Sequence, residues 1–545
     1  MEFEVAINQI GYGVYAKKVA FSLRPMRRVH LVEDMTGAER FRAGTVEEMR
    51  DPILGRTVYQ WDFTGFGAPG QYRVVAEGAQ SASFGLGGQP YRSVFSLAMR
   101  SYLCQRCGIA LNDPVSGVHH PVCHLRPART VDTGEVVEVS GGWHDAGDYG
   151  RYTQTAGVTV GQILMLAELA PRTVAGTDLS LPDCRPEWSD TWTEVAYELD
   201  WMFKMQRSDG AVYHKVNTDQ FCAMVLPQDD VEPLIVYDVA TPDTGIFAAA
   251  MARAARVWQP LDPGYATKAL HAAMRAWDFL SHHQPLLNPK NGHTGAYSRQ
   301  SDADERLWAA AELWLSTGDM EYERYVDAHW TEVLGDAPGS LPALNWQHCA
   351  VMVPIAMALD PDRAGERLFA RSQERLVKNG ERLLQLSEAQ GFGVVLAANE
   401  YRWASAKAAV AHGLNLALAH RLTQRKEFLD AALAQWNFVL GCNALCRSWL
   451  TGAGEGSTRH PHHRYVSASG ILIPGLLVGG ANAEGYRQDH VSPNVDGPMA
   501  YVDRSEAFAV NENAIDYNAP LVVLSAYLHE TWDRSESPRD LGSRG

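Results

Sequence analysis

A change of hydrophobic periodicity near residue 90 constrains the fold of this chain most strongly. Before it, short alternating apolar runs such as residues 58–63 are separated by turn residues, which is typical of a small β-sandwich. From Tyr91 onward, apolar residues recur at three- and four-residue spacing, for example in residues 269–280 and 408–422. The pattern predicts a β domain followed by a long series of amphipathic helices.

Glycines and a proline in residues 84–90 mark the boundary between the two patterns. We therefore expect a mainly α protein with a small domain of residues 1–86 and a helical domain of residues 87–545. The predicted helices are separated by long polar connections rich in glycine and proline, at residues 206–243, 285–304 and 441–503. Connections of this length inside a compact protein are usually functional, so the chemistry is expected in loops at one end of a helical scaffold.

Charge and composition exclude several classes of partner. The chain has 545 residues, a formal net charge of -16 and 46% hydrophobic residues. Phosphate binding needs a positive field, so neither nucleic acid nor an anionic membrane is an expected partner. No apolar run approaches the roughly 18 residues of a membrane span, and the first residues lack a signal-peptide pattern. A cytoplasmic, monomeric protein is expected.

Residues 141–150 read GGWHDAGDYG and hold two aspartates, Asp145 and Asp148, three positions apart. So many glycines disfavour a helix interior and indicate a shaped loop. Carboxylates beside rings such as Trp143 and Tyr149 suit an enzyme that activates water while a sugar packs against an aromatic face. The alternative is a turn whose aspartates cap their own backbone.

Two further polar clusters lie near the C-terminus. Residues 511–521 contain Glu512, Asp516 and Tyr517, spaced so that they share one helical face, although an acidic helix N-terminus explains the same residues. Residues 460–464 read HPHHR, which indicates either a metal site or hydrogen-bond donors directed at sugar hydroxyls and a carboxylate.

Together these three motifs resemble glycoside hydrolase family 9, the inverting cellulases. Residues 213–216 (YHKV), 304–310 (DERLWAA), 439–441 (VLG) and 474–480 (PGLLVGG) are similar to that family as well. The resemblance covers nearly the whole chain and implies an (α/α)6 barrel. Residues 1–86 resemble the immunoglobulin-like β-sandwich that precedes the barrel in one branch of the family.

The resemblance implies a role for each motif. Asp148 corresponds to the general base that deprotonates water, Asp145 to a residue that helps to hold this water, and Glu512 to the general acid. An inverting enzyme needs its acid and base roughly 6.5–9.5 Å apart, and an acid whose pKa is raised. The residues expected to bind substrate are Trp143, Tyr149, His462, Arg464 and Tyr517.

A metal site is predicted from Cys107, Cys123, His124 and His144. Two thiolates and two imidazoles suit tetrahedral zinc, and four protein ligands leave no open position, so the ion is expected to be structural. The spacing is not that of a zinc finger, but the same features resemble a structural zinc site in the immunoglobulin-bearing branch. Cys104 is a competing ligand, and buried cysteines near an unrelated histidine are the simpler alternative.

Asp302, Asp304 and Glu305 lie where the family can bind calcium. An acidic cap on a helix that begins near residue 306 explains the same three residues, so both interpretations stay open.

We expect an inverting hydrolase that cleaves β-1,4-glucosidic bonds in soluble β-glucans or cello-oligosaccharides, of the endoglucanase type. One alternative is an exo-acting β-glucosidase or β-D-glucosaminidase on short oligosaccharides. Other classes of function are a zinc-dependent hydrolase that uses His144 and the histidines of residues 460–463, or a sugar-binding protein without catalysis.

Overall fold

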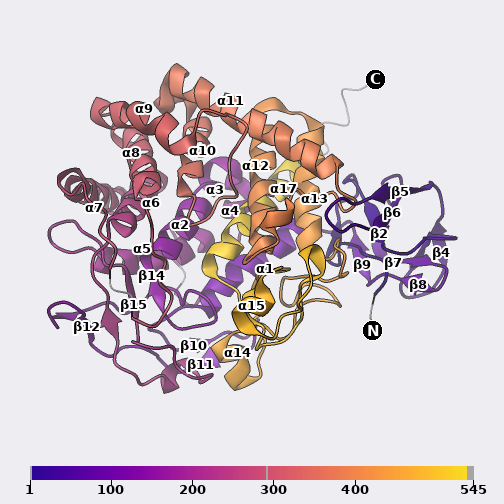
Figure 1. Ribbon diagram of the computed structural model, residues 1–545, viewed down its shortest axis with the longest axis horizontal. Coiled ribbons are helices and arrows are strands. Elements are labelled where there is room, and N and C mark those ends of the chain that lie inside the picture. The colour runs from indigo at the N-terminus through magenta and orange to yellow at the C-terminus, as the bar shows by residue number, and fades with distance from the viewer. Residues whose placement is uncertain (1–2, 184, 290–291, 537–545) are drawn as a thin grey trace.

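The computed structural model describes residues 3–183, 185–289 and 292–536. A small β domain lies beside a large helical one (Figure 1). The β domain contains two facing sheets, one ordered β1-β9-β7-β3-β4 with β8 on β7, the other β2-β6-β5. The strands are β1 (Gly11–Tyr12), β2 (Val19–Ser22), β3 (His30–Glu33), β4 (Glu39–Phe41), β5 (Val46–Arg50), β6 (Thr57–Asp62), β7 (Gly70–Ala76), β8 (Ala79–Gln80) and β9 (Phe84–Leu86).

Alternating side chains build the core of this sandwich. In β7, Tyr72, Val74 and Ala76 are buried, while the residues between them are partly exposed. Trp61 stacks on Phe63 with ring centroids 5.4 Å apart, in a cluster of aromatic rings between the sheets. The period-2 pattern in the sequence therefore corresponds to one buried and one solvated face of each strand.

Six inner helices form a ring in the described part of the helical domain. Successive members α2, α6, α8 and α10 pack on one another, α11 contacts both α10 and α12, and α17 closes the ring by packing on α12 and α2. Their bounds are α2 (Thr153–Ile163), α6 (Thr241–Trp258), α8 (Ala303–Thr317), α10 (Met352–Leu359), α12 (Ser405–Thr423) and α17 (Ile515–Glu536).

Each inner helix is paired with an outer one, in the order α17 with α1, α2 with α5, α6 with α7, α8 with α9, α10 with α11 and α12 with α13. The outer helices are α1 (Pro90–Cys104), α5 (Asp190–Lys204), α7 (Pro263–His282), α9 (Met320–Leu334), α11 (Pro361–Glu388) and α13 (Lys426–Val439). This is the predicted (α/α)6 barrel.

Burial explains why inner and outer helices differ in sequence. Every residue of α2 is buried, whereas α9 buries only Tyr322, Val326 and Trp330, on one face. Small residues let the inner helices approach closely. A Cβ atom on Gly157 would lie 2.2 Å from Ile246 of α6. Inner helices are therefore buried on nearly all sides and are rich in small and apolar residues, whereas outer helices are amphipathic.

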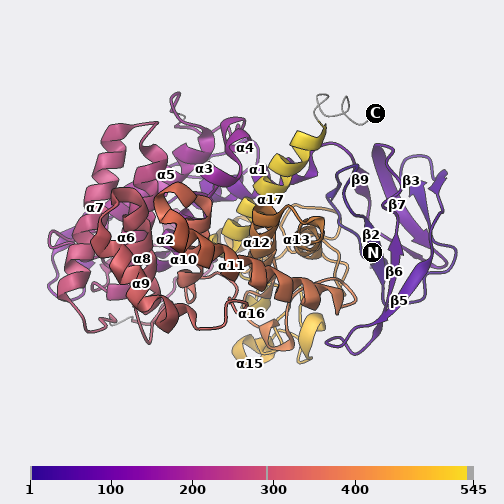
Figure 2. The same cartoon turned by 90° about the horizontal axis from the view of Figure 1, so that it is seen from above.

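The sandwich is held against the barrel by polar contacts. The Asn8 amide donates to Oδ1 of Asn437 at 2.7 Å, and Arg73 pairs with Glu455 at 2.7 Å. Figure 2 shows the sandwich on the side of the barrel where α13 lies. The described helices include none that is long and apolar enough to cross a membrane.

The long connections are more ordered than the sequence suggests. The connection of residues 206–243 supplies β15 and β16, which pair with three strands of the segment between α1 and α2. The resulting sheet is ordered β13-β12-β16-β15-β14, and the sequence analysis does not predict it. Its strands are two or three residues long, too short to show a clear alternation. They are β12 (Ala128–Thr130), β13 (Val136–Val137), β14 (Arg151–Tyr152), β15 (Lys215–Asn217) and β16 (Ile235–Val236).

Candidate active site

The loop of residues 141–150 is fixed by buried carboxylates behind it. The backbone N–H of Trp143 donates to Glu198 at 2.6 Å, and its indole N–H donates to Glu194 at 2.8 Å. Gly142 adopts a φ of 75° against Trp201, where its missing side chain permits the close approach. Since Trp143 is fully buried and does not line the pocket described below, its predicted contact with substrate is wrong; it anchors the loop.

Asp148 lies at the end of this loop, where β14 begins. Its Oδ2 atom accepts hydrogen bonds from the backbone N–H of Gly150 at 3.0 Å, the Tyr152 hydroxyl at 3.2 Å and the Asn217 amide at 3.3 Å. Three donors on one oxygen hold the carboxylate in a fixed orientation. The β14–β15 pair brings Asn217 to this position.

Asp145 is held by two hydroxyl groups. Oδ1 accepts from Thr155 at 2.5 Å, and Oδ2 accepts from Tyr297 at 2.7 Å. Its backbone carbonyl accepts the N–H of Ile515 at 2.7 Å, which ties the loop to the start of α17. Burial and the nearby charge of Asp148 raise the pKa of Asp145 well above its ordinary value.

Glu512 follows α16 (Phe508–Asn511) and lines the same pocket as the two aspartates. Burial, and then the charge of Asp148, raise its pKa to about 8. The segments are in direct contact, because a Cβ atom on Gly147 would lie 2.1 Å from the carbonyl oxygen of His462 and 3.2 Å from Oε1 of Glu512. Only glycine fits at residue 147.

His462 and Arg464 line the pocket, as does Tyr517. Nδ1 of His462 lies 2.7 Å from the carbonyl oxygen of Ser505. The Arg464 guanidinium donates to the carbonyl oxygens of Gly147 at 3.1 Å and Cys222 at 3.0 Å. The structure therefore brings these three predicted substrate-binding residues to the same cavity as the three carboxylates.

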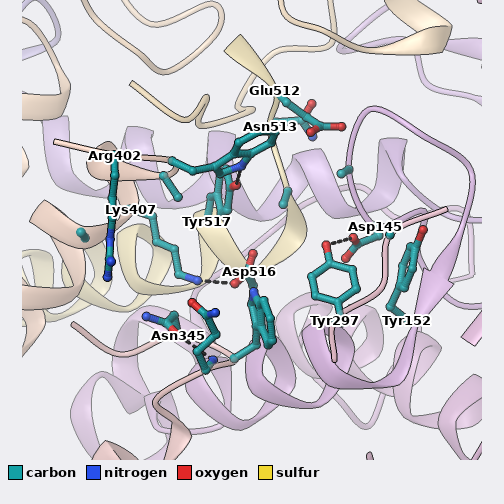
Figure 3. A pocket seen from close by; sticks show the side chains of 18 of the residues that line it. Asp145, Tyr152, Tyr297, Asn345, Arg402, Lys407, Glu512, Asn513, Asp516 and Tyr517 are labelled. Atoms are coloured by element: carbon teal, nitrogen blue, oxygen red, sulfur yellow. Dashed lines mark hydrogen bonds and ion pairs between the residues drawn. The ribbon is translucent and has the colours of Figure 1, made fainter. Parts of the chain in front are cut away.

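The pocket has a volume of about 730 Å³ and contains several residues that the sequence analysis does not select (Figure 3). Tyr297 points at Asp145, and Lys407 forms a buried ion pair with Asp516. Asp516 belongs to a motif that the sequence highlights, but Tyr297 and Lys407 have no such signal. Aromatic residues that line the pocket are Tyr152, Phe221, Tyr297, Trp346, Trp403, Phe508 and Tyr517.

Tyr149 lies behind the pocket wall. Its ring packs against those of His124 and His144, with centroids 5.5 and 4.9 Å away, and its hydroxyl donates to Val225 at 2.7 Å. The ring is buried and does not line the cavity. The prediction that Tyr149 contacts substrate is therefore wrong, because the loop turns this side chain toward the predicted metal ligands.

The four predicted metal ligands converge. One ligand atom from each of Cys107, Cys123, His124 and His144 lies within 4.8 Å of the others, and all four residues are buried. Nδ1 of His124 is buried and has no hydrogen-bond partner in the described part of the chain, so a lone pair is left for a cation. Two thiols and two imidazoles are a suitable donor set for a metal ion. Cys104 is directed elsewhere, toward Ser116 at 3.5 Å.

Asp230 completes the surroundings of this cluster. Its Oδ2 atom lies 3.2 Å from Nε2 of His124, the ring nitrogen that faces away from the other ligands. A carboxylate in this position fixes the tautomer and orientation of a metal-binding histidine. The sequence analysis misses Asp230 because it is far from its partner along the chain.

The carboxylates predicted to bind calcium have arginine neighbours. Asp302 pairs with Arg306 at 3.0 Å, and Arg299 lies 2.8 Å from Glu305 and 3.8 Å from Asp304. Among the described residues, these carboxylates form no group whose oxygens converge on one point. The guanidinium groups supply positive charge here, but Oδ2 of Asp302 and both carboxylate oxygens of Glu305 are buried and accept no hydrogen bond within the described ranges, so the calcium site stays a prediction.

A ring of paired helices with a carboxylate-lined pocket at its loop end suits a glycosidase, and the family comparisons show this class. The family model described as "Glycosyl hydrolase family 9" matches residues 91–525, and "Cellulase N-terminal ig-like domain" matches residues 2–81. The chain belongs to glycosyl hydrolase family 9. The family, the barrel and the immunoglobulin-like sandwich predicted from the sequence are thus confirmed.

Similar proteins span nearly the whole chain. A cellodextrinase of Butyrivibrio fibrisolvens is 30% identical, over 95% of this chain and 98% of that protein. Endoglucanase D of Acetivibrio thermocellus is 31% identical, over 88% of this chain and 76% of that one. The crystal structure of a metagenome-derived family 9 endoglucanase is 38% identical with a TM-score of 0.91, covering 97% of this chain and 99% of that chain.

One solved structure bears on the metal cluster. It is titled a Zn-binding triple mutant of the family 9 endoglucanase J30, is 35% identical, has a TM-score of 0.89, and covers 95% of this chain and 99% of that chain. In this chain, a site able to hold a metal rests on its own four converging ligands.

Proposed function

We propose that this chain hydrolyses β-1,4-glucosidic bonds of soluble β-glucans and cello-oligosaccharides, with inversion at the anomeric carbon. The observation that carries the proposal is the contrast between two carboxyl groups in one pocket. Burial raises the pKa of Glu512 to about 8, whereas one oxygen of Asp148 accepts three hydrogen bonds. A buried carboxyl group with a raised pKa suits the general acid, and a carboxylate held in place by several donors suits the base.

In this proposal Asp148 takes a proton from water, Asp145 helps to hold that water, and Glu512 protonates the leaving oxygen. Water attacks the anomeric carbon as the glycosidic bond breaks, so the proton released to Asp148 is balanced by the proton given up by Glu512. His462, Arg464 and Tyr517 bind the sugar beside the cleaved bond. The half-exposed ring of Phe221 and the indole of Trp403 provide apolar faces for pyranose rings.

The substrate class follows from the relatives and from the pocket. The names cellodextrinase and endoglucanase belong to proteins that match this chain over most of its length. A cavity of about 730 Å³ lined by rings and by polar groups of both charges suits a neutral oligosaccharide. The predicted metal ligands do not line this cavity, which favours carboxylate catalysis over a zinc-dependent hydrolase.

A time course with cellotetraose tests the proposal. The α-anomer of the newly formed reducing end should appear first by NMR and then mutarotate. Cleavage at internal bonds should give cellobiose early. An initial β-anomer would contradict the role given to Asp148. Activity only on chitosan oligomers, with stepwise release of glucosamine, would replace the proposed substrate by that of an exo-β-D-glucosaminidase.

We also propose that the cluster of two cysteines and two histidines binds zinc in a structural role. Four protein ligands would fill a tetrahedral ion, and the His124–Asp230 contact supplies the supporting carboxylate. Because His144 directly precedes Asp145, the ion would anchor the loop that carries both aspartates. Metal analysis of the purified protein should give about one zinc per chain; a metal-free protein of equal thermal stability would contradict this role.

A further inference from the structure

Tyr297 has an unusual backbone conformation at the pocket. Its φ is +42°, in the left-handed region that bulky residues rarely adopt, and its hydroxyl donates to Oδ2 of Asp145 at 2.7 Å. The ring stands edge-on to Tyr152 and Trp346, with centroids 4.8 and 5.0 Å away. A strained residue persists only when its surroundings hold it there. The question is which residues hold Tyr297.

Two adjacent side chains bind the three residues that precede it. Nζ of Lys215 donates to Oγ1 of Thr294 at 2.8 Å and to the carbonyl oxygen of Gly295 at 2.8 Å. Nε2 of His214 lies 2.9 Å from the carbonyl oxygen of Ala296. Residues 294–297 have no helix or strand of their own, so these contacts replace the hydrogen bonds of regular structure.

Both side chains are themselves fixed. His214 is 1% exposed, and its Nδ1 atom lies 2.9 Å from Oδ2 of Asp243 at the start of α6. Each nitrogen of the His214 ring thus lies within hydrogen-bond distance of an oxygen atom, which fixes the orientation of the ring. The ammonium of the fully buried Lys215 lies 4.4 Å from the ring centroid of Tyr237 and 5.5 Å from that of Tyr152. Neither group lines the pocket.

We propose that His214 and Lys215 are positioning residues, which hold residues 294–296 so that the Tyr297 hydroxyl stays on Asp145. They belong to the YHKV motif of residues 213–216, which the proposed acid and base roles leave without a function. The inference rests on the proposed function, because it gives this contact a part in turnover. Without the pair, the strained Tyr297 relaxes to an ordinary backbone conformation and its hydroxyl leaves Asp145.

A double-mutant cycle tests the proposal. Lys215→Met and Tyr297→Phe should each lower kcat about 10- to 100-fold on cellotetraose with KM changed less than threefold, the order of loss that a 1 Å misplacement causes. The double variant should be no slower than Tyr297→Phe alone, because Lys215 acts through that hydroxyl. Thr294→Val removes one acceptor of the lysine and should give a smaller kcat loss that also vanishes in the Tyr297→Phe background.

Lys18→Met is the matched control. Lys18 is a fully buried lysine of the sandwich whose Nζ donates to the carbonyl oxygens of Val14 at 2.7 Å and Ala16 at 2.9 Å. It should cost stability and leave kcat within twofold of the unaltered chain. A merely structural role for Lys215 would give the same result as this control.

Three outcomes would overturn the inference. These are a normal kcat in Lys215→Met, losses that multiply in the double variant, and a loss confined to KM. If Lys215→Met does not fold, the same double-mutant cycle is measured with Thr294→Val and Tyr297→Phe. The kcat loss of Thr294→Val should then be absent in the Tyr297→Phe background. If the unaltered chain shows no turnover on any β-glucan, the proposed function fails instead, which separates that result from a failure of the positioning role.

Discussion

The loop of residues 141–150 has two sides with different chemistry. On the pocket side, Asp145 and Asp148 are buried but accept hydrogen bonds from hydroxyl, amide and backbone donors. On the inner side, His144 belongs to a buried group of thiols and imidazoles, in which Nδ1 of His124 has no hydrogen-bond partner among the residues that the structure describes. Burial is similar on both sides. The two sides differ in their hydrogen-bond donors. The aspartates have several donors around them and suit proton transfer with water, whereas the thiols and imidazoles offer lone pairs that suit a metal cation.

This comparison makes the two sides separable by mutation. Changes on the pocket side should affect turnover with little change in stability. Changes on the inner side should affect metal content and thermal stability first, and turnover only through movement of the loop. The predictions below test this separation from the largest expected effect to the smallest.

Removing a proposed catalytic carboxylate should have the largest effect. Asp148→Asn or Glu512→Gln should lower kcat on cellotetraose by about 10³-fold or more, because each removes a proton-transfer group. Circular dichroism melting should show a fold that is intact. Glu530→Gln is the control: Glu530 lies in α17, 4% exposed, and binds Arg172 and Thr173 outside the pocket. It should lower stability and leave kcat unchanged. Near-normal rates in either pocket variant would refute the assignment.

On the inner side, Asp230→Asn should weaken metal binding about 10- to 100-fold, because the carboxylate on His124 no longer orients the ligand. Competition with a chromophoric chelator measures this affinity. The exposed neighbour Asp229 serves as the control, since Asp229→Asn alters charge by the same amount without a contact to the cluster. Equal affinities in the two variants would show that Asp230 does not support the site.

The alkaline limb of the pH profile should also depend on the pocket side. The pKa of Glu512 is raised to about 8, so the residue is protonated below that pH and loses its proton above it. With Glu512 as the general acid, kcat/KM should fall about tenfold per pH unit above pH 8. A kcat/KM that stays constant up to pH 10 would exclude Glu512 as the general acid.

The same shift has a consequence for stability. The carboxyl of Glu512 titrates near its ordinary value of 4.5 in the unfolded chain but near 8 in the fold, so stability falls as pH rises between these values. Glu512→Gln should remove this part of the pH dependence, so the variant should gain in melting temperature over the unaltered chain at pH 8.5 but not at pH 4. Parallel melting curves at the two pH values would contradict the burial of Glu512.

The smallest effect is expected at the pocket edge. Phe221 lines the pocket, is 46% exposed, and has the Arg464 guanidinium 5.2 Å from its ring centroid. Phe221→Ala should raise KM for cellotetraose about three- to tenfold with kcat nearly unchanged, because a ring face for a sugar is lost. Met224→Ala, at a similarly exposed residue of the same loop that does not line the pocket, should leave KM unchanged. Equal KM values would place the sugar elsewhere.

The sequence by itself determined the two-part architecture and the three motifs that meet in the pocket. Periodicity follows directly from burial on one face of a strand or helix, and Asp148, Glu512 and the four metal ligands lie in short, distinctive patterns. The tertiary structure decided which side chains of those motifs point into the pocket and which point into the interior. Trp143 and Tyr149 flank the aspartates in the chain, yet they point inward, because a loop with glycine at residue 142 turns successive side chains to different sides.

Contacts between residues far apart in the chain could not be predicted from the sequence either, because the tertiary fold sets them. Tyr297 is 152 residues from Asp145, and Lys407 is 109 residues from Asp516. Only closure of the helical ring brings such pairs together, and no local pattern encodes it. The carboxylates predicted to bind calcium are close in sequence to their arginine neighbours, Arg299 and Arg306. Even there, the sequence did not predict which carboxylate pairs with which arginine. Residue types are local information, whereas the partner that neutralises a buried charge is set by packing.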